Sequence, residues 1–483
     1  MAALLRLFRL GSQSLWIDEV LTWRSAYIGR PIGLPEVLEN VHGPFYSLVL
    51  HLWGGVFGES EWALRLPSAL AGIALVPATA WVAGRWLGAA TAVPAAWLAA
   101  GSPFLIWYAQ EARNYSMLML WAVLAAAALL GMRDRLSAAG VAGWLGATAA
   151  GTLSNFSFTL LAPLHAAWWL GAPGRRGRRL LVALAAAAAL ALVLLPWVPR
   201  LGSIWDWTRL RPARAIAAAE PRLRTEATFH PAAVPFALHA FAVGYGLGPP
   251  VRELRREPVL RALRPHVPAL AATALVFGAL GVLGARAVWR RKRALEAALW
   301  IVAPLLLLCY LALHNFKVFH PRYVAVAVPG VLIVLAAGLA DLGGRARAAF
   351  AVAIGALWAV SLAHHYGDPR YAKEDIRSAA ALIDREGGPG QKIVSVNTGE
   401  LLLYYYRGPL TVEPFWLGLA ADPERMAARF EDLARSPNGT WVVLARPEDL
   451  DPAGQFVRHL EHRHPGASRH AFNGVTVWRL PPR

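Results

Sequence analysis

Ten apolar runs, separated by short arginine-rich segments, dominate the first three quarters of this 483-residue chain. A helix needs about 20 predominantly apolar residues to cross the hydrocarbon core of a bilayer, and each run approaches that length. Several runs contain proline, which membrane helices tolerate. The pattern predicts about 10 to 11 membrane spans, with the first one short. The ten runs are residues 63–83, 90–107, 115–130, 139–153, 156–170, 180–198, 267–284, 297–313, 323–339 and 348–363.

The composition supports a membrane protein and excludes two other classes. Hydrophobic residues make up 57% of the chain and charged residues only 16%, which is too apolar for a soluble protein of this size or for a disordered one. The net charge is +18. In a soluble chain this excess would suggest a nucleic-acid partner. Here basic cytoplasmic loops and a phosphate-bearing ligand account for it, so we expect no nucleic acid.

Four basic segments set the expected orientation, at residues 133–135, 175–179, 286–293 and 345–347. Short basic loops favour the cytoplasmic side of a membrane. All four fall on that side only if residues 200–266 stay outside, so the apolar stretch Pro231–Leu247 must be re-entrant or interfacial. Its prolines and glycines suit a segment that lines a cavity. This orientation places residues 11–60 and the C-terminal tail on the extracytoplasmic side.

The chain divides near residue 365 into a membrane domain (1–365) and a tail (366–483). The tail alternates amphipathic helices with stretches such as QKIVSVN, TWVVLA and VTVWRL, which predicts an α/β domain with a mainly parallel sheet. The expected fold is therefore a polytopic α-helical membrane protein with extracytoplasmic interfacial helices and a C-terminal soluble α/β domain. Met1–Leu10 is half a crossing at most, so the first helix is stunted or the sequence starts late. No signal-peptide cleavage site follows it.

Two adjacent acids, Asp18 and Glu19, stand in the apolar and aromatic context SLWIDEV. Neighbouring carboxylates in surroundings of low dielectric raise one pKa, which makes a general base or a metal site possible. A solvated pair in a loop is the alternative. The next segment, HGPFYSLVLHLWGGVFGESEW, predicts an aromatic helix in the membrane interface, from which His42 and Tyr46 could reach a substrate. Arg65, at the head of the following span, is expected to snorkel.

Two further polar clusters fall on the same side. The turn WYAQEARNYS carries Glu111 and Arg113, which can orient hydroxyl groups and a phosphate or can simply pair with each other. The segment HNFKVFHPRYVAV places Lys317, Arg322 and Tyr323 at the entry of a span. Arginine at the outer end of a helix runs against the positive-inside bias, so Arg322 predicts an anionic partner such as a lipid phosphate. The headgroup of a bulk lipid is the alternative.

The order of these motifs resembles a known family. The segments WIDE, HGPFYSLVLHLWGGVFGESEWALRLPSALAG, SPFLIWYAQEARNYSMLML, GYGLGPPVREL, HPRYVAVAVPG and KEDIRSAAALI with LLLYYYRGP follow one another along the chain. In this they resemble the bacterial polyprenyl-phosphate-sugar glycosyltransferases of the C-type superfamily, relatives of the protein O-mannosyltransferases and of the lipid A aminoarabinose transferase. The resemblance covers nearly the whole chain. It implies a multi-pass enzyme of the bacterial plasma membrane that takes a sugar from a polyprenyl-phosphate carrier on the extracytoplasmic face.

The resemblance also implies roles for the candidate residues. Asp18 would be the general base on the acceptor hydroxyl, and Glu19 would tune its charge or help to hold a possible divalent metal ion. The remaining candidates form two groups, one for donor phosphate binding (Arg322, Tyr323, Lys317 and Arg113) and one for substrate binding (His42, Tyr46, Glu111 and Tyr245).

The expected reaction follows from the leaving group. A polyprenyl phosphate carries negative charge, so the enzyme must supply a cation for it and a base for the incoming hydroxyl. A single base predicts inversion at the sugar carbon, because no second carboxylate is obvious beyond Glu111. The sugar would be a hexose or pentose. The acceptor would be a glycan, lipid or protein of the cell envelope, as in protein glycosylation or in lipopolysaccharide and cell-wall synthesis.

Two other functional classes stay open at this point. One is a transporter or flippase of a lipid-linked or polar substrate, although we find no internal repeat and the charged clusters lie at helix ends. The other is a polytopic binding protein whose acid pair is inert.

Overall fold

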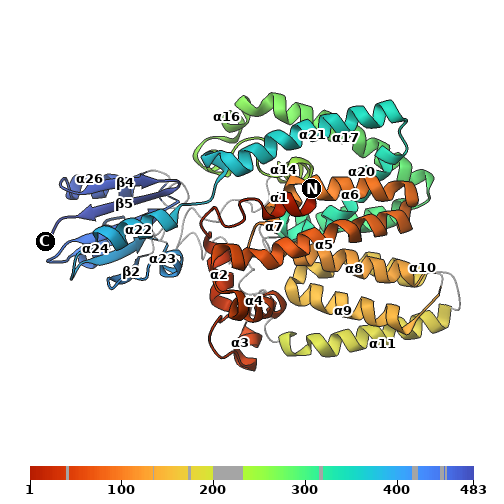
Figure 1. Ribbon diagram of the computed structural model, residues 1–483, viewed down its shortest axis with the longest axis horizontal. Coiled ribbons are helices and arrows are strands. Elements are labelled where there is room, and N and C mark those ends of the chain that lie inside the picture. Colours follow the sequence, from red (N-terminus) through yellow and green to blue (C-terminus); the bar gives the residue numbers. More distant parts are fainter. Residues whose placement is uncertain are drawn as a thin grey trace.

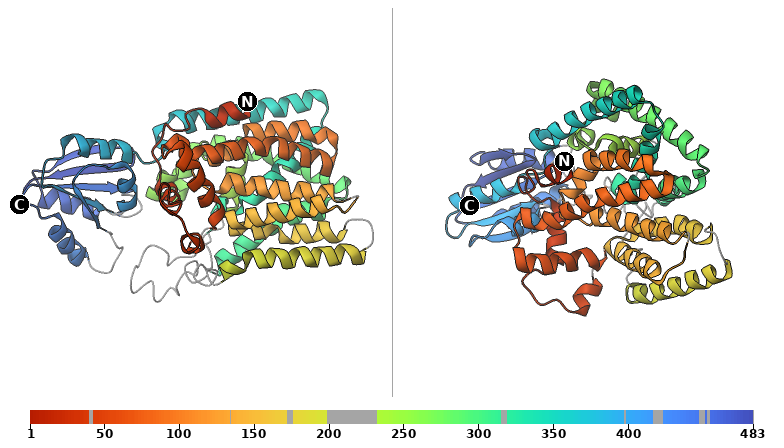
Figure 2. Two further views of the ribbon diagram at one scale, coloured as in Figure 1. Left: turned by 60° about the horizontal axis from the view of Figure 1, so that its bottom comes forward. Right: turned by 45° about the vertical axis from the view of Figure 1, so that its right-hand side comes forward.

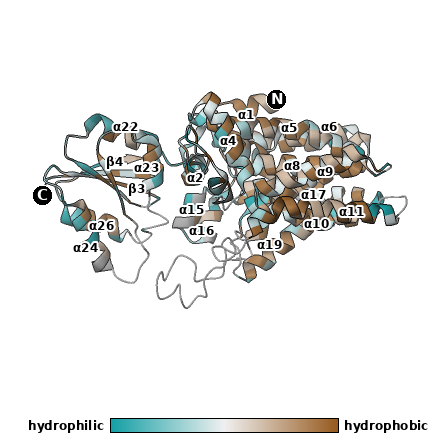
Figure 3. Cartoon of the chain, turned by 90° about the horizontal axis from the view of Figure 1, so that it is seen from below, coloured by the Kyte–Doolittle hydropathy of each residue, from teal (hydrophilic) through white to brown (hydrophobic). Residues whose placement is uncertain are grey.

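The computed structural model describes residues 1–39, 43–133, 135–171, 176–198, 232–314, 319–396, 398–415, 423–446, 451 and 454–482. A bundle of helices forms the larger part of the molecule, and a smaller α/β domain lies at one end of it (Figure 1). The left view of Figure 2 shows the same separation. The helices of the bundle are mostly hydrophobic, whereas hydrophilic residues are frequent in the α/β domain and near the junction (Figure 3).

The membrane part of the described chain is almost entirely helical. Its elements are α1 (Ala2–Leu7), α2 (Ile17–Ser25), α3 (Leu34–Glu39), α4 (Pro44–Phe57), α5 (Glu61–Leu87), η1 (Ala89–Thr91), α6 (Ala92–Gly101), α7 (Pro103–Ala109), α8 (Tyr115–Gly131), α9 (Ala138–Ser154), η2 (Phe156–Leu161), α10 (Ala162–Gly171), α11 (Arg176–Leu194), η3 (Leu195–Trp197), α14 (Ala233–Val243), α15 (Val251–Arg256), α16 (Val259–Leu263), η4 (Arg264–His266), α17 (Val267–Arg290), α18 (Ala294–Ala297), η5 (Ala298–Val302), α19 (Ala303–Leu313), η6 (Pro321–Ala327), α20 (Val328–Ala340) and α21 (Gly344–Gly367).

Within the described residues, six helices are long and apolar enough to cross a membrane. A seventh span results if Ala89–Gly101 and Pro103–Ala109, which meet at an angle of 55°, are counted as one. The predicted runs in α8 and α9 form helices of 17 residues each, about 26 Å long and thus just short of a full crossing. The run 156–170 is divided between η2 and α10. Each of the ten predicted runs is helical, which confirms the polytopic fold.

The basic segments gather at the end of the bundle away from the α/β domain. Nη2 of Arg291, in the turn after α17, lies 2.6 Å from a carboxylate oxygen of Asp341, in the turn before α21. Arg291 also donates to the carbonyl of Leu87 at the end of α5, and Arg179 donates to the carbonyl of Met132 after α8. These contacts join the turn after α17 to the turn before α21, and the start of α11 to the turn after α8, so the basic segments meet in pairs at one end of the bundle.

The stretch predicted to be re-entrant contains one short helix in its described part. Helix α14 has 11 residues, which span about 16 Å, roughly half of a crossing. Gly244 follows the helix, with a φ of +71°, and an added Cβ there would lie 2.8 Å from Cβ of Pro103. The chain then continues along the junction, where the hydroxyl of Tyr371 donates to the carbonyl of Gly248 over 2.6 Å. Helix α14 is therefore too short to cross as a straight span, and the re-entrant placement of this stretch stays a prediction.

The α/β domain is a sheet between two helical layers. Ile393, Trp441 and Val443 pack with α22 and α23 on one side of the sheet. Val394 and Val442 pack with α24 and α26 on the other, because side chains alternate along a strand. The elements are α22 (Ile376–Glu386), β1 (Lys392–Val396), α23 (Gly399–Tyr405), β2 (Thr411–Phe415), α24 (Pro423–Ala434), β3 (Thr440–Ala445), α26 (Gln455–Arg463), β4 (Ser468–Phe472) and β5 (Val475–Leu480).

The sheet is mixed, and the prediction of a mainly parallel sheet was wrong. The strand order is β2-β1-β3-β5-β4. Strand β1 runs parallel to β2 and β3, but β5 is antiparallel to both β3 and β4. Strand β4 is a polar edge strand, SRHAF, without an apolar alternation that would reveal it. Its hairpin turn is visible in the sequence, however, because Asn473-Gly474 is a favoured two-residue loop between Phe472 and Val475.

The inner helices of the α/β domain share one apolar core with the end of the bundle. Leu15, Val20 and Ala112 of the membrane part pack with Ile376 of α22 and Leu401 of α23. The loop before α2, the α7–α8 turn and the α/β domain are therefore held against one another. This junction positions the polar residues described next.

Candidate functional site

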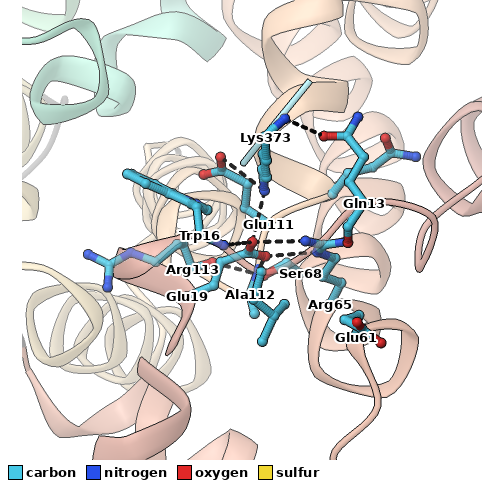
Figure 4. A network of polar contacts seen from close by, with 12 residues as sticks. Gln13, Trp16, Glu19, Glu61, Arg65, Ser68, Glu111, Ala112, Arg113 and Lys373 are labelled. Atoms are coloured by element: carbon cyan, nitrogen blue, oxygen red, sulfur yellow. Dashed lines mark hydrogen bonds and ion pairs between the residues drawn. The ribbon is translucent and has the colours of Figure 1, made fainter. Parts of the chain in front are cut away.

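Polar side chains from several segments far apart in the chain meet at the junction of bundle and α/β domain (Figure 4). They come from the N-terminal loop with α2, from the start of α5, from the α7–α8 turn, from η6 and from the segment that leads into α22. Five of the predicted candidates are among them: Asp18, Glu19, Glu111, Arg113 and Arg322.

Asp18 and Arg322 form an ion pair on the more open side of this cluster. Nη1 of Arg322 donates to Oδ2 of Asp18 over 3.0 Å, and the two side chains are 20% and 22% exposed, respectively. The guanidinium group lies 5.6 Å from the ring of Trp16 and 5.2 Å from the ring of Tyr323. Its Nε is buried and has no hydrogen-bond partner among the described residues. Arg322 therefore retains a donor for a further oxygen atom.

Glu19 lies on the other side of α2 in a closed network. Its side chain is fully buried, and Arg65 donates to both carboxylate oxygens from Nε and Nη2, over 2.8 and 2.9 Å. The backbone N–H of Ala112 donates over 2.7 Å, and Nζ of Lys373 donates over 2.9 Å. Burial opposes ionisation, but the charges of Arg65 and Lys373 outweigh it, so the pKa of Glu19 lies well below its usual range.

Arg65 fixes the loop that precedes Asp18. Besides Glu19, it donates to the carbonyls of Leu10, Gln13 and Ser14 over 2.8 to 3.0 Å. Its side chain is 2% exposed. The prediction that Arg65 snorkels was wrong, because the N-terminal loop folds over the head of α5 and offers carbonyl and carboxylate oxygens where solvent was expected.

Glu111 is also buried at this site. Its Oε1 accepts a hydrogen bond from Nε1 of Trp107 over 3.0 Å and lies 3.5 Å from Nζ of Lys373. Its Oε2 is buried without a partner among the described residues. Burial has the largest effect on Glu111 and raises its pKa overall; the charge of Lys373 opposes this rise, and the nearby charge of Glu19 adds to it. The free oxygen can accept a hydrogen bond from a hydroxyl group.

Arg113 does not pair with Glu111 in this structure. Its Nη1 donates to the carbonyl of Asp18 over 3.0 Å and to Oγ1 of Thr22 over 2.6 Å. It thereby ties the α7–α8 turn to α2. Its Nε is buried without a hydrogen-bond partner among the described residues, so it keeps a donor available for the predicted phosphate contact.

Two predicted tyrosines lie near Arg322. The hydroxyl of Tyr323 is 3.4 Å from Nη2 of Arg322. The hydroxyl of Tyr245 lies 2.8 Å from that of Tyr108, and its ring packs 5.2 Å from that of Trp107. These rings form an aromatic wall beside Glu111 and Arg322.

Tyr46, another substrate-binding candidate, does not reach the open side. Tyr46 is 2% exposed, and its hydroxyl lies 2.7 Å from Oγ of Ser68, which in turn donates to the carbonyl of Arg113. Tyr46 therefore supports the α7–α8 turn from within the core, and we assign it no contact with a substrate. His42 and Lys317 lie outside the described residues.

The predicted use of Glu19 as a metal ligand does not fit this geometry. Both of its oxygens are occupied by cationic or N–H donors, and two positive charges lie beside them. Asp18 points instead to Arg322. In the described part of the chain, no three His, Cys, Asp or Glu side chains form a group that could hold a metal ion. We therefore derive no step through a metal ion.

Three residues of the site were not predicted from the sequence. Lys373 and Arg446 come from the tail, and Trp16 precedes the acid pair. The ring of Trp16 lies between two arginines, 5.6 Å from the guanidinium of Arg322 and 5.8 Å from that of Arg446. Lys373 stands in the charged stretch KEDIRS, which has the composition of a solvated helix start. Its partner Glu19 is 354 residues away, so local pattern carries no signal of the contact.

Comparisons with known proteins agree with the resemblance seen in the sequence. Residues 41–201 match the family model described as dolichyl-phosphate-mannose-protein mannosyltransferase. The crystal structure of ArnT from Cupriavidus metallidurans bound to undecaprenyl phosphate has a TM-score of 0.59 and 16% identity, over 99% of this chain and 96% of that chain. The apo state of that protein gives a TM-score of 0.58.

An archaeal structure shares the fold as well. The oligosaccharyltransferase of Archaeoglobus fulgidus, in complex with Zn and sulfate, has a TM-score of 0.55 and 15% identity, over 99% of this chain and 72% of that chain. No curated protein sequence matches the chain. Together with the family match, these structures confirm the predicted resemblance: the chain is a multi-span membrane protein with the fold of the C-type glycosyltransferases.

Proposed function

We propose that this protein transfers a hexose or pentose from a polyprenyl-phosphate carrier to a hydroxyl group of an envelope acceptor. The single observation that carries the proposal is the Asp18–Arg322 pair. A carboxylate that can act as a base and a cation with a free N–H donor lie 3.0 Å apart on the open side of the site. One group suits an incoming hydroxyl and the other a departing phosphate.

The proposed reaction has a single displacement. The acceptor hydroxyl gives its proton to a carboxylate oxygen of Asp18 as the acceptor oxygen bonds to the anomeric carbon. The bond from that carbon to the phosphate oxygen breaks, and its electron pair leaves with the polyprenyl phosphate. Arg322 stabilises the charge that develops on the phosphate. Because one bond forms as the other breaks, the sugar carbon is inverted.

Donor binding frees the base in this scheme. Without substrate, Arg322 neutralises Asp18. A phosphate has more acceptor oxygens than a carboxylate and matches the planar guanidinium group in a bidentate manner, so it can draw Arg322 away from Asp18. Glu111 offers its free oxygen to a hydroxyl of the sugar. The undecaprenyl phosphate bound to ArnT from Cupriavidus metallidurans supports a carrier of this class.

The test uses purified wild-type protein, in detergent and reconstituted into vesicles, with a panel of synthetic polyprenyl-phosphate sugars. The proposal expects release of polyprenyl phosphate together with a new glycoside on an added acceptor. A protein that moves the intact lipid across a vesicle membrane, without cleaving any donor in the panel, would be a transporter and would contradict the proposal.

We further propose that the site faces the extracytoplasmic side of a bacterial plasma membrane. The basic loops lie on the opposite face of the molecule. The chain has one cysteine, Cys309, so a Cys309→Ser background allows single labelling sites. Exposed Ala381 in α22 and exposed Gly177 in a basic segment form a matched pair for substitution by cysteine. An impermeant reagent on intact cells should label position 381 alone. Labelling of position 177 alone would contradict the proposed orientation.

A further inference from the structure

Lys373 is a tail residue whose ammonium group lies inside the site. It belongs to the segment between α21 and α22, yet its Nζ is 2.9 Å from Oε2 of Glu19 and 3.5 Å from Oε1 of Glu111. Its side chain is only 11% exposed. Lys373 is thus a nearly buried cation shared by two fully or almost fully buried carboxylates.

The two carboxylates do not need this lysine equally. Glu19 already has a bidentate partner in Arg65 and an N–H bond from Ala112. Glu111 has Trp107 as its only other donor among the described residues, and its second oxygen has no partner there. Removal of Lys373 would therefore leave Glu111 with the larger loss of compensating charge.

The α/β domain holds Lys373 in place through its backbone. Nδ2 of Asn473, at the tip of the β4–β5 hairpin, donates to the carbonyl of Lys373 over 3.0 Å. The carbonyl of Asn473 accepts from the N–H of Asp375 over 2.9 Å. On the opposite side, the N–H of Lys373 donates to Oε1 of Gln13 over 3.1 Å. The position of the ammonium group thus depends on the docked α/β domain.

We infer that Lys373 is a positioning residue through which the α/β domain completes the site: its ammonium group holds the Glu111 carboxylate in place and favours its charged form. This inference deepens the proposed function and rests on it for the role of Glu111 toward the sugar. An ionised Glu111 can accept a hydrogen bond from a sugar hydroxyl at its free oxygen, whereas a protonated Glu111 would lose one acceptor position. Lys373 itself has no contact with the reacting atoms in this scheme.

Charged residues from several segments of the chain surround Glu111. The small cavity beside it is also lined by Arg9, Arg65, Lys373 and His365. Glu19, Asp18 and Arg322 act on Glu111 through their charges as well. Only Lys373 lies within 4 Å of the Glu111 carboxylate as a cation among the described residues. An opposite charge at such a distance typically moves a carboxyl titration by about 1 to 3 pH units.

The test is an infrared titration of the purified protein, which needs no substrate. Wild type, Lys373→Met and Glu111→Gln are compared by the C=O stretching band of a protonated carboxyl group. The band that Glu111→Gln abolishes should titrate about 1 to 3 pH units higher in Lys373→Met than in wild type. An unchanged midpoint in a folded Lys373→Met protein would overturn the inference.

Chemical rescue separates charge from folding. In a Cys309→Ser background, Lys373→Cys can be alkylated with 2-bromoethylamine, which restores an ammonium group of nearly the same length. The midpoint should return toward that of wild type after alkylation but not after treatment with neutral iodoacetamide. A return with both reagents would assign the effect to packing and overturn the inference.

Transfer assays distinguish this inference from the proposed function. If wild type transfers sugar, the acidic limb of its pH profile should move upward by a similar amount in Lys373→Met. If wild type transfers sugar but Lys373→Met shifts neither the acidic limb of the pH profile nor the infrared midpoint of Glu111, only the role of Lys373 is contradicted. A wild-type protein that cleaves no donor contradicts the proposed function, and the infrared titration still decides whether Lys373 controls Glu111.

Discussion

Asp18 and Glu19 are adjacent acids that each pair with an arginine, yet their surroundings differ completely. The Glu19 side chain is 0% exposed and is held by Arg65, Lys373 and backbone N–H groups. The Asp18 side chain is 22% exposed and has one charged partner, Arg322, over 3.0 Å. Successive residues of a helix point about 100° apart, so α2 turns one acid into the junction and the other toward the open side.

This difference indicates which acid can do chemistry. Breaking a fully hydrogen-bonded, buried ion pair strands a charge away from water and costs several kcal/mol. A partly exposed pair such as Asp18–Arg322 can exchange its partner at lower cost, because water and a substrate phosphate replace the lost interaction. The comparison assigns Glu19 to the architecture of the site and Asp18 to the reaction.

The largest expected effect on stability comes from Glu19→Gln. The amide cannot balance the buried charges of Arg65 and Lys373, so we expect a loss of about 3 to 5 kcal/mol in the free energy of unfolding. Asp18→Asn should cost less than about 1 kcal/mol, because its pair is partly solvated. Thermal unfolding of purified variants in one detergent measures both.

The matched control is Glu386→Gln, which removes an acid from a solvated pair with Arg385. It should unfold close to wild type. Equal unfolding temperatures for Glu19→Gln and Asp18→Asn would erase the difference between the two acids.

Acid should separate the two acids in a second way. The folded-state pKa of Glu19 is lowered, so its contribution to stability is complete above its unfolded pKa of about 4.3 and is lost as pH falls through the folded value. Wild type should therefore lose stability progressively below about pH 4.3. Glu19→Gln should show a shallower acid dependence of its unfolding temperature. Parallel curves for the two proteins would contradict the buried ion-pair assignment.

Arg322→Lys sharpens the other side of the comparison. A point charge cannot reproduce a bidentate guanidinium contact, so we expect donor binding to weaken at least about tenfold, or about 1.4 kcal/mol. Arg24→Lys is the control, since Arg24 is 63% exposed and pairs with Glu400 of α23. Binding of a polyprenyl-phosphate sugar is measured at equal protein folding. Wild-type affinity in both Arg322→Lys and Arg322→Ala would refute the phosphate role.

The smallest expected effect comes from the hairpin tip. Asn473→Ala removes the bond to the carbonyl of Lys373 and also the bond that its Oδ1 accepts from Nη1 of Arg252, and each should contribute about 0.5 to 1.5 kcal/mol to the loss in unfolding free energy. It should also slow transfer, because Lys373 is less well held. Asn438→Ala is the control in the same domain, since the hydrogen bonds of Asn438 in the structure come from its backbone. Equal behaviour of the two variants would remove the hairpin tip from the site.

Periodicity and charge pattern predict the bundle well because they report the physics that builds it. The ten apolar runs are all helical, and the basic loops lie on one face. The sequence predicts the acid pair and Arg322 as site residues because charged side chains beside apolar spans are energetically unfavourable and therefore tend to be functional. The mixed sheet was missed because β4 has a polar edge-strand composition, although Asn473-Gly474 marks its turn.

The fine structure of the site depends on contacts that no local pattern contains. Whether Asp18 or Glu19 is buried is decided by the head of α5, by the α7–α8 turn and by a lysine 354 residues away. Arg65 was predicted to snorkel for the same reason, since its carbonyl partners come from a loop more than 50 residues earlier. Such assignments require the tertiary structure.

Turnover of a polyprenyl-phosphate sugar by Asp18→Asn, with donor binding measured separately, tests the central claim most directly. The amide keeps the shape of the side chain but cannot accept the proton, so the rate should fall by about 100- to 10,000-fold while donor binding stays near that of wild type. Asp384→Asn, at an exposed position of α22, should transfer at the wild-type rate. An Asp18→Asn protein that retains more than about a tenth of wild-type turnover would contradict the assignment of Asp18 as the base.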